Sequence, residues 1–168
     1  MNERHTISAL VQDRPGVLQR VAGLFGKRGY NIESVTVGGA EKKGMARMTI
    51  VAKGDERTCA QIVLQLRKLI DVVEAYALAP GSYLSRELML VKLTARPEDR
   101  PQMLALVDTF RCAVVDVGRD TITVQASGDA AKNDALLQLF EPFGVAELTR
   151  TGETAVARGR ESDGRMTH

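Results

Sequence analysis

Residues 13–35 read DRPGVLQRVAGLFGKRGYNIESV, and this stretch decides the fold. Apolar residues recur in it at i, i+3, i+4 and i+7, which is typical of a helix with one buried face. That face carries Leu18, Val21, Ala22 and Phe25. Pro15 suits the first helical position, and Gly29 suits the helix stop. A strand pattern, YNIESVTVG, follows at once. The stretch therefore predicts a helix leading directly into a strand.

The flanking residues extend this pair into a longer pattern. HTISALVQ (5–12) precedes the helix and reads as a strand, and MARMTIVAK (45–53) reads as another. Asp55 is a candidate N-cap for a second helix, and DVVEAYAL (71–78) is a fourth strand. The apolar stripe of that second helix comprises Cys59, Ile62, Val63, Leu66, Leu69 and Ile70. Cys59 is therefore interpreted as a core residue rather than a nucleophile.

The same order of elements occurs again after Pro80-Gly81. Strand patterns lie at 85–95, 112–118, 121–127 and 145–151, with helical patterns beginning near Met103 and Ala135. Two copies of β-α-β-β-α-β predict an α+β protein with two ferredoxin-like domains. We expect one domain at residues 1–79, a second at 80–152, and a polar, flexible tail at 153–168.

Composition limits the classes of function. The 168 residues are 44% hydrophobic and 4% aromatic, with a net charge of +2, which does not favour a nucleic-acid surface. Two cysteines make no disulfide framework. No apolar run has the length of a membrane span, and no signal peptide is evident, so a cytoplasmic, soluble protein is expected.

The inventory for catalysis is poor. The two histidines, His5 and His168, lie near the chain ends, which disfavours a histidine-based nucleophile or a zinc site. Neither a Walker loop nor a G-x-G-x-x-G motif occurs. We therefore expect no catalytic site, no metal and no cofactor in this chain.

A repeated tripeptide points to a binding site instead. DRP occurs at residues 13–15 and 99–101, followed by Gly16 in the first copy and Gln102 in the second. The first turn of a helix has free backbone N–H groups and partial positive charge, and glycine lets a carboxylate approach them. On this interpretation the first domain binds a small carboxylate and the second does not. The alternative is that Gly16 only relieves crowding in a tight turn.

The residues also carry a resemblance to a known family. DRPGVLQRVAGLFGKRGYNIESVTVG, the later RMTI, and RELMLVKL at the start of the second half resemble the small regulatory subunits of acetolactate synthase, also called acetohydroxyacid synthase. The resemblance covers residues 5 to about 159. It implies an N-terminal ACT domain, the amino-acid-sensing version of this fold, and a C-terminal ferredoxin-like domain.

The resemblance also implies a partner and an effector. Such subunits bind a large catalytic subunit that uses thiamine diphosphate, magnesium and FAD. They raise its activity and commonly confer feedback inhibition by valine or another branched-chain amino acid, in the first shared step of valine, leucine and isoleucine synthesis. In the family the effector lies between the ACT domains of a homodimer. The implied effector-binding residues are Asp13, Gly16, Val17, Leu18, Asn31 and Ile32.

The chemistry of these positions suits an amino acid. The amides of Gly16, Val17 and Leu18 can receive the carboxylate, and Asn31 offers a donor and an acceptor. Simpler roles stay open: Asp13 as a helix cap, Asn31 as a turn residue and Ile32 as strand core. The family often has asparagine at the position of Asp13. Because a carboxylate repels an effector carboxylate, effector affinity or identity is expected to differ.

A second class of function is a freestanding amino-acid-sensing ACT protein, such as a transcriptional or signalling regulator. A DNA-binding sensor would carry a helix-turn-helix or a basic face, and neither is evident in the sequence. The regulatory subunit is therefore the leading hypothesis.

Overall fold

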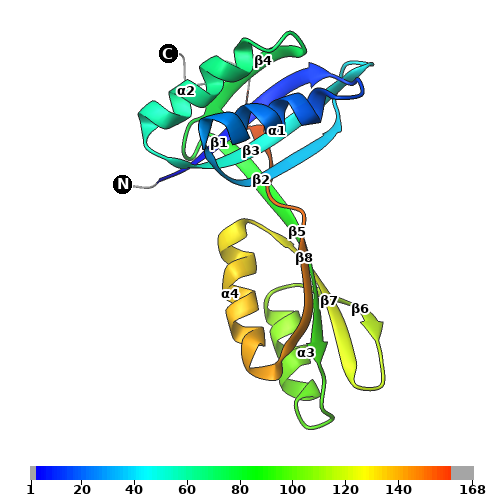
Figure 1. Ribbon diagram of the computed structural model, residues 1–168. Helices are drawn as coiled ribbons and strands as arrows, with labels where there is room; N and C mark the ends of the chain where they lie inside the picture. The colour runs from blue at the N-terminus through cyan, green and yellow to red at the C-terminus, as the bar shows by residue number, and fades with distance from the viewer. Residues whose placement is uncertain (1–2, 160–168) are drawn as a thin grey trace. The chain divides into compact units, whose positions relative to one another are not determined.

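The computed structural model describes residues 3–159, which form two compact units. Residues 3–85 and 153–159 make the first unit, and residues 86–152 make the second. Each unit contains an antiparallel sheet and two helices (Figure 1). The predicted α+β class with two βαββαβ ferredoxin-like domains is confirmed.

The first unit has a four-stranded sheet in the order β2-β3-β1-β4, so β2 and β4 are its edges. In the pairing of β2 with β3 the register shifts between Ile32 and Ser34, which makes Glu33 a bulge residue. The elements of this unit are β1 (Glu3–Gln12), α1 (Val17–Arg28), β2 (Asn31–Gly39), β3 (Met45–Gly54), α2 (Glu56–Arg67), β4 (Val72–Leu78) and β9 (Thr154–Ala157).

The helix signals in the sequence act as predicted at three positions. Gly29 ends α1 in the left-handed conformation, at φ 64°, and its N–H donates to the carbonyl of Gly26. Asp55 caps α2, because its side chain accepts a hydrogen bond from the N–H of Thr58 at 2.7 Å. Cys59 faces the core and is 3% exposed.

Two local predictions are wrong. Helix α1 begins at Val17 rather than at Pro15, since Gly16 turns the backbone at its start. Ile70 is not on the buried stripe of α2, because that helix ends at Arg67. The side chain of Ile70 is 94% exposed in the connection to β4.

The core of the first unit lies between the helices and one face of the sheet. It includes the fully buried Ile7, Met48, Ile50, Ile62 and Leu66. This face of the sheet therefore depends on both α1 and α2 for its burial.

Part of the other face of the same sheet packs against the C-terminal strand β9. Thr49, on this face, is buried, and its Oγ1 accepts a hydrogen bond from the N–H of Ala155 at 3.2 Å. Tyr76, Leu78 and Ala155 form a small apolar cluster there. Residues 153–159 are therefore part of the first unit, and not a flexible tail as expected. Residues 160–168 of that expected tail lie outside the described residues.

The second unit has the strand order β6-β7-β5-β8. Its core includes Met89, Leu93, Met103, Leu136 and Phe140. The expected boundary at residues 79 and 80 differs from the division observed after Ser85, because β5 starts in the first unit and continues into the second. The elements are β5 (Tyr83–Thr94), α3 (Arg100–Thr109), β6 (Ala113–Val117), β7 (Thr121–Gly128), α4 (Ala130–Phe140), η1 (Glu141–Phe143) and β8 (Val145–Arg150).

Candidate functional site

The loop from β1 to α1 is held by backbone hydrogen bonds at its start. The N–H of Gln12 donates to the carbonyl of Asp71 at 2.8 Å, and that of Asp13 donates to Gly44 at 3.0 Å. Gly16 then adopts φ 87° and ψ −9°, in the left-handed region. A side chain is strained in this conformation, so the backbone requires glycine at position 16 whether or not a ligand binds.

A cation lies over this glycine. A Cβ at position 16 would be 3.1 Å from Nη1 of Arg20. The Nε and Nη2 atoms of Arg20 are each 2.6 Å from Oδ2 of Asp71, whose side chain is 7% exposed. The interpretation that Gly16 relieves crowding is thus supported, and the crowding group is a guanidinium. Neither Arg20 nor Asp71 was among the sequence candidates, because 51 residues separate them.

The loop has the features of an anion-binding helix start. The 12-residue α1 has no side-chain cap at its N-terminus, so Asp13 is not a helix cap. The N–H of Val17 makes a long hydrogen bond of 3.4 Å to the carbonyl of Arg14. First-turn amides that lack a partner within the helix, the helix dipole and the nearby Arg20 all favour a bound carboxylate. Leu18 is 53% exposed beside them.

The second DRP copy is not structurally equivalent to the first. Helix α3 already begins at Arg100, so Gln102 is inside the helix, whereas Gly16 precedes α1. The guanidinium of Arg100 donates to the carbonyl of Arg119 at 2.8 Å and to that of Gly118 at 3.3 Å. The sequence comparison treated Gly16 and Gln102 as equivalent positions, one open to a carboxylate and one obstructed by a side chain, and this equivalence is wrong. The two copies differ in backbone conformation as well as in side chain.

The remaining predicted site residues lie at the other end of α1. Asn31 and Ile32 begin β2 and line an open hollow with Phe25, Gly29 and Tyr30. Asn31 is exposed, and Ile32 is partly buried against the core, as the alternative of a strand-core role expects.

Within one chain, the predicted site residues at the start of α1 and those at the start of β2 do not lie together. The structure places Asp13, Gly16, Val17 and Leu18 in one loop and the start of α1, and it places Asn31 and Ile32 at the far end of that helix. A helix of 12 residues is about 18 Å long. Both groups can contact one small ligand only if a second copy supplies one of them.

The bulge residue Glu33 joins β2 to two other strands. Its carboxylate is 2.6 Å from Nε of Arg4 and 2.7 Å from Nζ of Lys53. Partial burial acts to raise the pKa of Glu33, but hydrogen bonds from Lys53 and Arg4 outweigh it and hold that pKa below its usual value. Arg4 also lies 3.6 Å from the carboxylate of Glu153. The start of β2 is therefore fixed by a network of charges.

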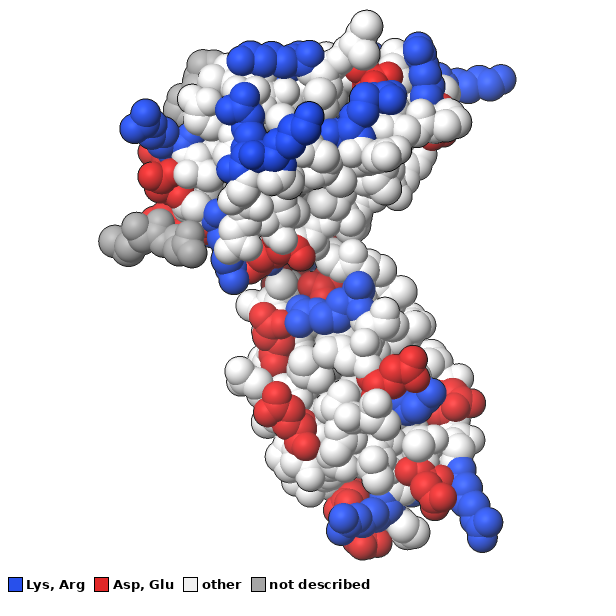
Figure 2. All heavy atoms as spheres, in the orientation of Figure 1, with Lys and Arg blue, Asp and Glu red and all other residues white. Residues whose placement is uncertain are grey.

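The first unit is basic and the second is acidic. Residues 3–85 and 153–159 contain 13 Lys and Arg against 9 Asp and Glu, and residues 86–152 contain 8 against 10. Helix α1 has basic residues and no acidic one. On the face drawn in Figure 2, Lys and Arg gather over the first unit. The net field of this unit therefore attracts a carboxylate.

Burial raises the pKa of the Cys59 thiol to about 11, so it is a protonated core group at neutral pH. Within residues 3–159, no three or more His, Cys, Asp and Glu side chains are grouped to hold a metal ion. In the same range, no helix has the length and apolar character needed to cross a membrane.

Comparison with known proteins connects this geometry to a family. Residues 86–159 match the family described as "Small subunit of acetolactate synthase", and residues 7–74 match the "AHAS small subunit-like ACT domain". The chain is 51% identical over 158 residues to a protein of Methanothermobacter thermautotrophicus named "Probable acetolactate synthase small subunit", covering 94% of each chain. It is 47% identical over 155 residues to the acetolactate synthase small subunit of Mycobacterium leprae, covering 92% of each.

The chain belongs to the acetolactate synthase small-subunit family. The crystal structure of the small subunit from Thermotoga maritima superimposes with a TM-score of 0.88 at 37% identity, covering 94% of this chain and 99% of that one. The protein is thus a regulatory small subunit of an enzyme of branched-chain amino acid biosynthesis, and its first unit contains the ACT domain.

The left-handed conformation of Gly16 can be tested without a ligand. Gly16→Ala should lower the free energy of unfolding of the first unit by about 1–2 kcal/mol, because a Cβ is strained at this φ. Urea denaturation would measure the change. The matched control is Gly23→Ala, inside α1 with open space around it, which should raise stability by about 0.5–1 kcal/mol. Equal effects of the two substitutions would contradict the assignment.

The network at Glu33 predicts a pH dependence. The pKa of Glu33 is lower in the folded chain, so its ionised form stabilises the fold at neutral pH, and this contribution is lost as the pH falls through the folded pKa. Glu33→Gln should cost about 1 kcal/mol at pH 7. The difference in the free energy of unfolding between this variant and the unsubstituted chain should shrink below about pH 4.3. Chemical denaturation across this range measures it, and the more exposed Glu147→Gln should cost less. A cost for Glu33→Gln that does not vary with pH would oppose the assignment.

Proposed function

We propose that this small subunit raises the turnover of the large catalytic subunit of acetolactate synthase and carries its feedback inhibition by valine or a related branched-chain amino acid. Membership of the family supports an association with a catalytic partner. That partner is expected to hold thiamine diphosphate, magnesium and FAD, and the complex to act in the cytoplasm. The observation that carries the proposal is the loop at Gly16, which has the features of a carboxylate site.

We place the effector between two ACT units. Strand β2 is an edge of its sheet, so its outer side can pair with a second copy. The loop at Asp13 lies beside the hairpin where β2 ends, as the hydrogen bond from Asp13 to Gly44 requires. In an antiparallel pair of β2 strands, the start of one strand lies beside the end of the other. Asn31 and Ile32 of one copy then lie beside the Gly16 loop of its partner.

The groups that this pairing assembles suit an α-amino acid. The helix start and Arg20 favour the carboxylate, and the side-chain amide of Asn31 can accept from the ammonium. Apolar contacts from Ile32 and the exposed Leu18 can bury an isopropyl group, at about 1.5–3 kcal/mol for a fully buried side chain.

Asp13 modifies this arrangement. The side chain is exposed and precedes the anion-binding turn, so its charge opposes the field of the helix start and Arg20. It attracts an ammonium group and repels a carboxylate placed near it. We therefore expect this residue to tune affinity for the effector, with activation of the catalytic subunit independent of it.

Pairing of two chains through β2 can be tested by measuring the molar mass of the protein in solution. Val37 of β2 is 47% exposed, and Val37→Lys should convert the dimer to monomers at micromolar concentration, because a lysine on an edge strand opposes its pairing with another strand. Size-exclusion chromatography with light scattering measures the mass. Val73→Lys, on the opposite edge strand at 54% exposure, should leave the dimer intact. Retention of the dimer by Val37→Lys would exclude this interface.

Reconstitution tests the function itself. The chain should raise the turnover of the thiamine-diphosphate catalytic subunit, and valine should inhibit the complex. Gly16→Asp should abolish inhibition and keep activation, because a carboxylate at position 16 repels the effector carboxylate from the helix start. Gly81→Asp is the matched control, since Gly81 has a similar φ of 80° in a turn remote from the loop. An unchanged rate on adding the chain, or full valine inhibition of Gly16→Asp, would contradict the proposal.

A further inference from the structure

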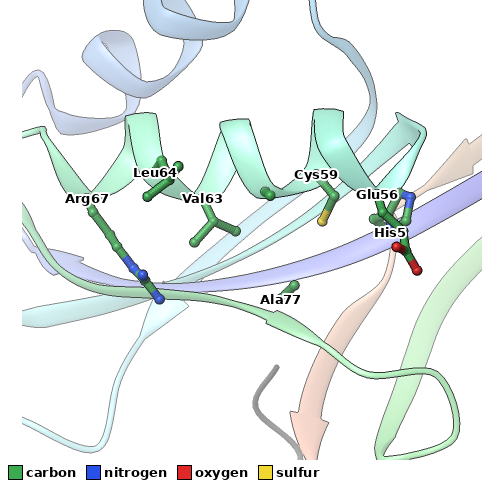
Figure 3. A pocket seen from close by; sticks show the side chains of 8 residues that line it. His5, Glu56, Cys59, Val63, Leu64, Arg67 and Ala77 are labelled. Carbon is green, nitrogen blue, oxygen red and sulfur yellow. The ribbon is translucent and has the colours of Figure 1, made fainter. Parts of the chain in front are cut away.

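A second cavity lies in the first unit, between α2 and the edge strand β4. Its volume is about 120 Å³, and none of the expected effector residues lines it. Figure 3 shows Cys59 and Val63 pointing from α2 towards β4, where Ala77 lies, with Arg67 at one end of the row and His5 and Glu56 at the other. The cavity is therefore apolar along its length and charged at its ends.

Small side chains create the apolar part. The wall consists of Cys59, Ala60, Val63, Leu64 and Ala77. Cys59 adds no charge to it, since burial raises the pKa of its thiol to about 11. An engineered apolar cavity of about 150 Å³ holds benzene, so a cavity of this size holds about four to six carbons.

The cationic end is Arg67. Its Nε donates to the carbonyl of Ala75 at 2.8 Å, which fixes the guanidinium against β4. In contrast to Arg4, Arg20 and Arg47, Arg67 belongs to none of the ion pairs within residues 3–159. Its terminal N–H groups are thus available to an external acceptor, and a guanidinium prefers a carboxylate.

The charges at the two ends of the cavity determine how a ligand is oriented and which chemical class of ligand can bind. Glu56 repels a carboxylate there, so the charge of the ligand is directed to Arg67. An α-amino acid is disfavoured, because its ammonium would lie beside the guanidinium of Arg67, which repels it. The cavity therefore selects a carboxylate without an α-ammonium group.

We propose that this cavity is a second ligand site, which binds a short aliphatic carboxylate with its chain of about four to six carbons between α2 and β4 and its carboxylate on Arg67. The site is independent of the amino-acid site proposed at Gly16. A variant that has lost inhibition by an amino acid at Gly16 still has this cavity.

Hexanoate is the probe, and the full-length chain is titrated with it by ¹H–¹⁵N NMR. We expect saturable shifts in α2 and in the part of β4 around Ala77, whether or not the carboxylate also shifts the Gly16 loop. Hexanol, which has the chain without the charge, should bind at least about tenfold more weakly, because it makes no charge-assisted hydrogen bond to Arg67. In Gly16→Asp the shifts of α2 and of β4 around Ala77 should saturate as they do in the unsubstituted chain, which separates this site from the amino-acid site.

Two variants identify the location. Ala60→Leu fills the cavity with a good helix former, and Arg67→Gln removes the charge; each should weaken hexanoate binding at least about tenfold. Lys68→Gln, on the neighbouring exposed residue, should bind as the unsubstituted chain does. Arg67 is itself exposed, so its variant is informative even if Ala60→Leu fails to fold. The absence of saturable binding, or binding that survives Arg67→Gln, overturns the proposal.

Discussion

Helix α1 is bounded by two left-handed glycines, Gly16 at φ 87° and Gly29 at φ 64°, and the candidate site depends on this constraint. Only glycine adopts this conformation without strain, so the two residues set where the helix begins and where it ends. Its length in turn separates the loop at Gly16 from Asn31 on β2. A small ligand that needs both ends must therefore be shared between two copies of the chain.

The sequence predicted those features that rest on local physics. Apolar spacing located the helices, and Gly29 and Asp55 located two of their ends, because each signal acts within a few residues. The start of α1 was misplaced because proline favours a helix start wherever it occurs, whereas the backbone at Gly16 reflects its surroundings. The sequence does not predict strand β9, because its four residues have no periodic pattern of their own and depend on distant partners, β5 for strand pairing and Thr49 for a hydrogen bond. Arg20 was missed for the same reason, since its partner Asp71 is distant in sequence.

The charges around β2 relate the candidate site to the rest of the chain. Glu33 follows the predicted site residue Ile32 and pairs with Arg4, which also lies beside Glu153. The hydroxyl of Thr36, also on β2, donates to the backbone carbonyl of Glu153 at 3.3 Å. Glu153 is the residue at which the chain leaves the second unit. The start of β2 is thus linked by charged and hydrogen-bonding groups to the segment at which the chain re-enters the first unit.

Strand β9 also has a consequence for the order in which the protein is made. The first unit needs residues 153–159 to cover Thr49 and its neighbours on the sheet face opposite the helices. During synthesis those residues leave the ribosome only after the whole second unit has been made. Part of one face of the N-terminal sheet therefore stays uncovered until the second unit has been synthesised. The unit that is encoded first is the one completed last.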